Sequence, residues 1–357
     1  MSKRRRVQDL SDEAEGSIFD AKSEKFYFNV YSDASVHERM LEDMTRTKAY
    51  QDAIFKFSDA IKGKVVADVG AGTGILSMFC IQAGAKKVYA VEASDMAEQA
   101  RGVIKANGMS EQIDVMQCLV EDCDLPEMVD VIVSEWMGCM LLYESMWVSL
   151  LCARDKWLKP NGLMWPSVTE LHLAPITNEG LWQEKKEIWD SVNENYGVNM
   201  SSMFPFAWTC LCRSVNIIVL SAENVLARGH VIAKFDMATV KISDLEHVKS
   251  DFSFASMGRG VLHGFAAWFT AAFDVRQNDS ELNSVVLTTS PYNEPTHWEH
   301  SVMYIEHPVT VDQDDIISGN IKITTNKKYS RWLDVQLTCR VKDNPEFEQK
   351  YTMNDLS

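Results

Sequence analysis

The stretch SEWMGCMLLYES, residues 134–145, places two glutamates nine residues apart, Glu135 and Glu144, among side chains that are mostly apolar. A carboxylate in apolar surroundings is costly unless a cation or a hydrogen-bond donor is its partner. One interpretation is a strand end followed by a helix, with each glutamate at an exposed edge. The other is that both glutamates face a cavity that holds a strongly cationic group, which would make this stretch a binding site.

Acidic side chains also stand at or just after the ends of four predicted strands. They are Asp68, Glu92, Glu121 and Glu135, and the strands span residues 64–69, 86–92, 112–118 and 128–135. In an open parallel sheet a ligand binds outside the carboxyl ends of the strands, so these four groups converge on one rim. One acid at a strand end is an ordinary turn residue, whereas four of them favour a ligand site.

The glycine-rich loop DVGAGTG, residues 68–74, follows the first strand and opens a helix, where the backbone can approach a ligand closely. Its glycines are spaced G-x-G-x-G rather than G-x-G-x-x-G, which disfavours a nicotinamide dehydrogenase. Glu92 comes 20 positions after Gly72, the place for a carboxylate that accepts both ribose hydroxyls, and Glu121 is placed to accept from an adenine amino group. Because the loop has no basic residue to neutralise a pyrophosphate, a nucleoside that carries a positive charge fits better. S-adenosylmethionine is such a ligand.

The elements that position these residues fall into two halves. In the first, the strands alternate with helices predicted over 75–84 and 94–108, an α/β pattern typical of a Rossmann-like parallel sheet covered by helices. The segment KPNGLMWPS, residues 159–167, is predicted to be a break. After it, short strand-like runs separated by turn residues indicate an antiparallel sandwich or barrel, interrupted by one amphipathic helix at 179–197. The runs span residues 169–176, 214–221, 230–237, 264–275, 283–290, 297–305, 320–325 and 332–341.

Composition and charge exclude several classes of protein. No apolar run in the 357 residues reaches the ~20 residues of a membrane helix, and the eight cysteines lack zinc-binding or redox spacing, so neither a membrane contact nor a metal site is expected. The 35 basic residues against 51 acidic ones give a net charge of −16, which repels nucleic acid and attracts basic partners. The basic block at residues 3–6 has the character of a nuclear import signal, so a nuclear location is predicted, with the cytoplasm as an additional location.

Several segments together resemble the type I group of the protein arginine N-methyltransferases. They are YFNVYSDASVHERMLEDMTRTKAY (27–50), DVGAGTGILS (68–77), VYAVEAS (88–94), SEWMG with YES (134–145) and SPYNEPTHW (290–298). The resemblance runs from about residue 25 to near the C-terminus. It implies a tail over 1–24, an S-adenosylmethionine-dependent methyltransferase domain over 25–165, and a β-barrel substrate domain over 166–357 with a dimerisation arm at about 178–200.

The resemblance also implies roles for individual residues. Those matched to cofactor contacts are Tyr31, His37, Met40, Arg46, Asp68, Gly70, Gly72, Glu92, Glu121 and Met137. Arg46 would hold the methionine carboxylate of the cofactor, and Tyr31 would belong to a lid that orders when the cofactor binds. The residues matched to catalytic roles are Glu135, Glu144, His297 and Asp43. The two glutamates would grip the substrate guanidinium, while Asp43 would hold the His297 imidazole, which accepts the lost proton or braces the site.

Product and partners follow from the same resemblance. Met40 matches a slim methionine that leaves room for a second methyl group on one nitrogen, which implies asymmetric dimethylarginine as the product. The expected substrates are arginine-containing basic proteins such as histones or glycine-arginine-rich proteins. A homodimer is expected through the helix at 179–197, whose Trp182, Trp189 and Tyr196 would pack on the partner's cofactor domain.

The sequence departs from the family pattern at one position, and two other functions remain as alternatives. Cys139 stands where family members usually carry a tyrosine, which is expected to widen the substrate pocket or loosen the glutamate loop. The first alternative is an S-adenosylmethionine-dependent methyltransferase for another amine, which transfer to arginine rather than lysine peptides would exclude. The second is a non-catalytic scaffold that binds the cofactor without turnover.

Overall fold

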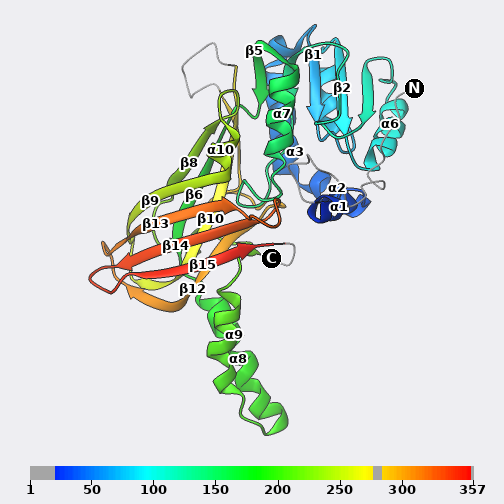
Figure 1. The fold of residues 1–357 in the computed structure, drawn as a ribbon. Helices are drawn as coiled ribbons and strands as arrows, with labels where there is room; N and C mark the ends of the chain where they lie inside the picture. The colour runs from blue at the N-terminus through cyan, green and yellow to red at the C-terminus, as the bar shows by residue number, and fades with distance from the viewer. Residues whose placement is uncertain (1–20, 276–283, 355–357) are drawn as a thin grey trace.

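The computed structural model describes residues 21–275 and 284–354 and places them in two domains with a projecting helical arm (Figure 1). The predicted import signal at residues 3–6 lies outside the described residues. Helix α1 (Ala21–Val30) begins four residues before the predicted start of the first domain, and α2 (Ala34–Glu42), α3 (Met44–Lys56) and α4 (Ser58–Ile61) follow it. Among the described residues, no helix is long and apolar enough to cross a membrane.

The first domain is built on a five-stranded parallel sheet in the order β3-β2-β1-β4-β5. Its strands are β1 (Val65–Val69), β2 (Lys87–Glu92), β3 (Ile113–Gln117), β4 (Val129–Val133) and β5 (Leu158–Trp165), and its helices are α5 (Ile75–Gln82), α6 (Met96–Ala106) and α7 (Trp147–Trp157). Every residue of β1 is buried, as expected for a central strand of a sheet covered on both faces. The strand order reverses between β1 and β4, so a crevice opens at their carboxyl ends.

All four strands and both helices predicted for this domain are present, with ends within two residues of the prediction. The break predicted over 159–167 is wrong for residues 159–165, which belong to the edge strand β5, and holds only for residues 166–167 between β5 and β6. The pairing of β5 with β4 shifts register between Val129 and Val131, and Asn161 has a φ of +62°. Proline and glycine are tolerated in an edge strand where it bulges.

The second domain consists of two antiparallel sheets that wrap into a barrel-like body, which confirms the predicted architecture (Figure 1). One sheet has the order β7-β12-β10-β6-β8 with β11 beside β10, and the other has the order β15-β14-β13-β9. The strands are β6 (Val168–Ile176), β7 (Asn216–Ile218), β8 (His230–Asp236), β9 (His247–Ala255), β10 (Gly260–Phe273), β11 (Val285–Thr288), β12 (His300–Val311), β13 (Ile316–Thr325), β14 (Leu333–Val341) and β15 (Phe347–Met353). Strands β9 and β15 were not predicted.

The predicted helix at 179–197 is α8 (Glu179–Tyr196), which forms the arm together with α9 (Phe204–Leu211) (Figure 1). The shorter helices of this domain are η2 (Ser201–Met203), η3 (Ala222–Asn224) and α10 (Ile242–Glu246). Trp182 packs inside the chain, with its ring centroid 4.7 Å from that of Phe204 and 4.6 Å from that of Trp208. Trp182 is half-buried and contributes to the packing of the arm itself, so its expected contact with a partner stays a prediction. Ile188 and Tyr196, farther along α8, remain exposed.

Candidate active site

A cavity lies between the carboxyl ends of β1 and β4 and the helices α1, α2 and α3. Most of the predicted site residues line it, namely Tyr31, His37, Met40, Arg46, Gly70, Gly72, Glu92, Glu121, Glu135, Met137 and Glu144. The remaining three, Asp43, Asp68 and His297, are not part of its wall. The fold thus brings residues from distant segments to the crevice where the strand order reverses.

The glycine loop after β1 is shaped for close approach by a ligand. Gly70 and Gly72 have φ angles of +73° and +52°, in the left-handed region that side chains with a Cβ rarely adopt. A Cβ on Gly70 would lie 2.2 Å from the Cε atom of Met146, so the end of that side chain would have to move to admit one. The Glu92 carboxylate accepts the backbone N–H groups of Gly72 and Ser94, each at 2.8 Å, which ties the loop to the end of β2.

The charge of the cavity wall fits a cationic nucleoside. Glu92, Glu121, Glu135 and Glu144 all contribute to the wall, and the glycine loop contributes no cation. The carboxylate of Glu121 accepts a hydrogen bond from the Ser149 hydroxyl at 2.7 Å, which holds it in place. The bare glycine backbone and the acidic wall therefore fit S-adenosylmethionine, with Glu92 available to its ribose and Glu121 to its adenine amino group.

Asp68 lies behind the glycine loop rather than on the cavity wall. Its side chain is fully buried, and one carboxylate oxygen accepts both the backbone N–H and the hydroxyl of Ser77, at 2.9 and 2.7 Å. These bonds fix the start of α5 beneath the loop. Burial raises the pKa of Asp68 to about 6, despite the stabilising hydrogen bonds from Ser77.

We expect the substitution Asp68→Asn to change how stability depends on pH. Between pH 4 and pH 6 the folded protein keeps a proton on Asp68 that the unfolded chain has released, so the stability due to this group falls as pH rises through that window. The variant has no such titration. Its free energy of unfolding relative to wild type should therefore rise by about 1–3 kcal/mol from pH 4 to pH 6 and level off above. Thermal unfolding at half-unit pH steps measures this difference, and a difference that is flat across the window would contradict the prediction.

The loop that carries the two glutamates has an unusual backbone. Four of its residues that are not glycine have left-handed φ angles, +53°, +65°, +73° and +55°, at Met140, Leu141, Glu144 and Ser145. Such angles persist only where the surroundings over-determine them. For two of the four residues, hydrogen bonds across the domain boundary do so: the N–H of Glu144 donates to the carbonyl of Arg331 at 2.9 Å, and the Ser145 hydroxyl donates to the carbonyl of Ser330 at 2.7 Å.

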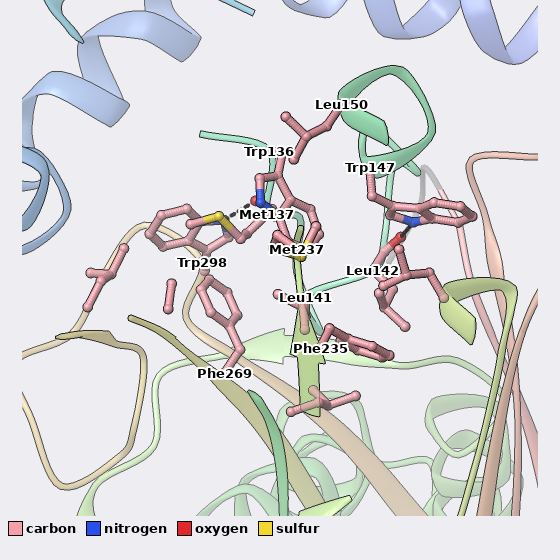
Figure 2. Packing of buried hydrophobic residues seen from close by; sticks show 14 of the residues in the cluster. Trp136, Met137, Leu141, Leu142, Trp147, Leu150, Phe235, Met237, Phe269 and Trp298 are labelled. Atoms are coloured by element: carbon pink, nitrogen blue, oxygen red, sulfur yellow. Dashed lines mark hydrogen bonds between the residues drawn. The ribbon is translucent and has the colours of Figure 1, made fainter. Parts of the chain in front are cut away.

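Packing of large side chains holds the same loop from below. Figure 2 shows apolar residues of the loop and of α7 against residues of the barrel; those labelled are Trp136, Met137, Leu141, Leu142, Trp147, Leu150, Phe235, Met237, Phe269 and Trp298. The indole N–H of Trp298 donates to the carbonyl of Met137 at 2.7 Å, and that of Trp147 donates to the carbonyl of Leu142 at 3.3 Å. The loop is thus clamped between the two domains.

Both glutamates of the loop face the cavity, so the interpretation of two exposed edges is wrong. Glu135 is nearly buried, and its carboxylate accepts hydrogen bonds from Nε and Nη2 of Arg46 at 3.1 and 2.9 Å. Glu144 accepts the phenol hydroxyl of Tyr31 from helix α1 at 2.8 Å. Burial and the nearby Glu144 carboxylate raise the pKa of Tyr31, which keeps its hydroxyl protonated as the donor. Two carboxylates at one cavity can bind a planar cation by charge-assisted hydrogen bonds.

Asp43 and His297 form a pair beside the cavity. One oxygen of Asp43 accepts both the Nδ1 and the backbone N–H of His297, each at 2.8 Å, and the other accepts the N–H of Arg46 at 2.9 Å as the cap of α3. Burial opposes the ionisation of Asp43, but these hydrogen bonds outweigh it and hold the pKa of the carboxyl below its usual value. An ionised Asp43 fixes the orientation of the His297 ring.

The sequence of the chain matches known protein families over both domains. Residues 66–162 match a methyltransferase domain, and residues 167–344 match the arginine methyltransferase oligomerization subdomain. A probable protein arginine N-methyltransferase 6.1 of Oryza sativa subsp. indica is 43% identical over 339 residues, which cover 89% of this chain and 89% of that relative. The chain belongs to the protein arginine N-methyltransferases. It falls in the type I group and depends on S-adenosylmethionine.

Other members of the family agree with this placement. The protein arginine N-methyltransferase 6 of Danio rerio is 42% identical over 330 residues, covering 92% of this chain and 93% of its own. The Trypanosoma brucei PRMT1 enzyme–prozyme heterotetrameric complex with AdoHcy contains a chain of similar fold, with a TM-score of 0.82 and 34% identity over 91% of this chain and 99% of that one. The segments YSDASVHE and HGFAAWF also favour protein arginine N-methyltransferase 6 within the family.

Two features of this methyltransferase site were not expected from the sequence. Arg331, from the turn between β13 and β14, lines the cavity with its guanidinium 3.7 Å from the ring centroid of Tyr27. Nothing in the local sequence KKYSRWL signals a site residue. Cys139 is half-buried, and its thiol donates to the carbonyl of Trp298 at 3.6 Å, so a contact to the barrel remains where the family has tyrosine.

Proposed function

We propose that this arginine methyltransferase modifies basic proteins, histones or glycine-arginine-rich proteins among them, and forms asymmetric dimethylarginine by way of the monomethylated form. The observation that carries the proposal is the convergence of Glu135 and Glu144 on one cavity, each held by a hydrogen-bond donor. A guanidinium is planar, always charged near neutral pH and rich in donors, which matches two carboxylates better than a lysine ammonium does.

Different residues of the chain bind the cofactor, orient the substrate and accept the proton. S-adenosylmethionine, when bound, supplies a methyl group on a cationic sulfonium; Glu92 would hold its ribose, Glu121 its adenine and Arg46 its carboxylate. Glu135 and Glu144 orient the substrate guanidinium, whose delocalised nitrogen is a poor nucleophile, so orientation and electrostatics lower the barrier. His297, braced by Asp43, is placed to take the proton that the nitrogen loses, directly or through a water.

The proposal includes a homodimer in the nucleus. The oligomerization subdomain and the exposed apolar residues of the arm support self-association. The basic block at residues 3–6 supports nuclear import, and the net charge of −16 supports basic substrates. A fluorescent fusion whose residues 3–6 are replaced by alanine tests the location; unchanged nuclear signal would remove this support.

The decisive experiment for the function follows the product. The full-length protein is incubated with isotope-labelled S-adenosylmethionine and either a glycine-arginine-rich peptide, a histone tail peptide or a matched peptide with lysine in place of arginine. We expect label in the arginine peptides alone, and fragmentation by mass spectrometry to give the neutral loss of asymmetric dimethylarginine. A symmetric or only monomethylated product would overturn the proposed product.

Met40 is expected to control the second transfer. Its side chain lines the cavity beside the Arg46 guanidinium, with the sulfur 3.7 Å from Nη2. The substitution Met40→Phe would overfill a close-packed site, so we expect the ratio of dimethylated to monomethylated product to fall by about tenfold. The matched control is Met44→Phe, since Met44 is 79% exposed on the next helix. Equal product ratios in Met40→Phe and wild type would refute the role of Met40.

A further inference from the structure

Arg331 connects three segments that are far apart in sequence. Its Nη2 atom forms a buried ion pair with Glu24 of helix α1 at 2.9 Å, with both side chains about 6% exposed. Its guanidinium stacks over the ring of Tyr27, also on α1. Its Nη1 atom donates to the backbone carbonyl of Glu144 at 2.6 Å. One guanidinium from the barrel therefore holds helix α1 and the glutamate loop at once.

These contacts form a closed circuit around the Glu144 side chain. The Tyr27 ring lies 4.6 Å from the Tyr31 ring, and the Tyr31 hydroxyl donates to the Glu144 carboxylate at 2.8 Å. The backbone N–H of Glu144 donates a hydrogen bond to the carbonyl of Arg331 at 2.9 Å, which closes the circuit. Glu144 is thus held at its backbone by Arg331 and at its carboxylate by α1, and α1 is itself held by Arg331.

The backbone of Glu144 makes this support necessary. Its φ of +73° is unfavourable for a residue with a Cβ, and only surrounding contacts can maintain it. A planar guanidinium can donate from two edges while its face stacks on an aromatic ring, whereas a lysine ammonium cannot do all three.

We propose that Arg331 is a positioning residue for methyl transfer, which couples the docking of helix α1 to the orientation of Glu144. When α1 docks, Glu24 and Tyr27 hold the guanidinium in the position where it also supports the Glu144 carbonyl. Without Arg331, α1 and the glutamate loop order independently, and the carboxylate loses its fixed direction.

Besides holding the Arg331 guanidinium in place, Glu24 neutralises its charge. A permanent cation in the wall of a cavity that binds cationic groups would compete for the Glu144 carboxylate if it were not neutralised. Glu24 neutralises it by pairing with Nη2, while Nη1 donates to the Glu144 carbonyl. We expect Glu24→Gln to lower kcat because Arg331 is then drawn toward the glutamate it should support.

The test uses the full-length protein and four variants, Arg331→Lys, Arg331→Leu, Glu24→Gln and the double variant Glu24→Gln/Arg331→Leu. A misdirected catalytic group costs about a hundredfold in rate, so both Arg331 variants should lose about that in kcat with a smaller change in the KM for peptide. Adding Glu24→Gln to Arg331→Leu should cause little further loss. The matched control is Arg340→Leu, because Arg340 is paired at 3.9 Å with Glu346 on an exposed face of the barrel.

A second readout separates positioning from simple stability. Hydrogen exchange with mass spectrometry, with and without S-adenosylhomocysteine, follows residues 24–31 and 138–146. In wild type both segments should gain protection together; in Arg331→Leu, α1 should gain it without the glutamate loop. Joint protection in Arg331→Leu, fully additive effects of the two substitutions, or a lowered Tm with unchanged kcat would each overturn the proposal.

Discussion

Replacing Glu144 by glutamine is expected to abolish methyl transfer while the affinity for S-adenosylmethionine stays close to that of wild type. The amide keeps the size of the side chain and can still accept the Tyr31 hydroxyl, but it removes one of the two charges that bind the guanidinium. Loss of one partner from a desolvated ionic site costs a few kcal/mol, a rate factor of about a hundred or more. Turnover of labelled methyl groups and calorimetric titration of the cofactor measure the two effects.

The control for this substitution is Glu98→Gln. Glu98 lies on α6, where its ion pair with Arg101 at 2.8 Å is exposed, so the same chemical change should leave turnover unaltered. Wild-type turnover in Glu144→Gln would remove Glu144 from the guanidinium site. A large loss of cofactor affinity would instead reassign Glu144 to the cofactor.

Disrupting the outer part of the arm is expected to give an inactive monomer. Ile188 and Tyr196 of α8 are 48% and 77% exposed, and Phe206 of α9 is 58% exposed, although all three are apolar or aromatic. An apolar surface of this kind needs a partner, and an interface between identical chains provides one. The double variant Ile188→Asp/Tyr196→Asp should elute as a monomer by light scattering, with methyl transfer at the background level.

Met257 provides the control for the arm, since it is also 58% exposed but lies in the turn between β9 and β10. Met257→Asp should leave both the assembly and the activity unchanged. Because Trp182 packs within the chain, it is left intact in the arm variant, so that the fold of the arm is preserved. A monomeric arm variant with full activity would separate catalysis from assembly and refute the prediction.

The sequence predicted the elements whose pattern is local. The buried run at β1, the glycine loop and the helices after β1 and β2 were all predictable, because burial on both faces and helix-ending glycines leave a clear record in consecutive residues. Strand β5 was not, since its proline and glycine are read as a break unless the bulge is known. Strand β9 largely alternates buried and exposed residues, but it has few apolar residues, and these are separated by charged and polar ones. The sequence therefore gives only a weak signal for a strand there.

The site was predictable to the extent that its residues lie in motifs. Glu92 stands at a fixed distance in sequence from the glycine loop, and Glu135 and Glu144 form a pair nine residues apart, so their spacing marked them as site residues. All three line the cavity. Arg331 could not be found in this way, because its role depends on a turn between barrel strands that meets helix α1 only in the folded chain. Trp182 shows the converse, since an apolar helix face in a sequence does not reveal whether its partner is the same chain or another.

The clamp shown in Figure 2 also bears on how ligands enter and leave. Trp136 and Trp147 of the first domain and Phe269 and Trp298 of the second belong to one hydrophobic core that spans both domains. Domains joined by a large apolar interface are less free to move relative to one another than domains joined by a small polar one. Opening the cavity by a hinge between the two domains would expose these aromatic rings to water, whereas undocking of α1 would leave this core in place. We therefore expect release of the spent cofactor to be a local event that depends on how tightly helix α1 is held.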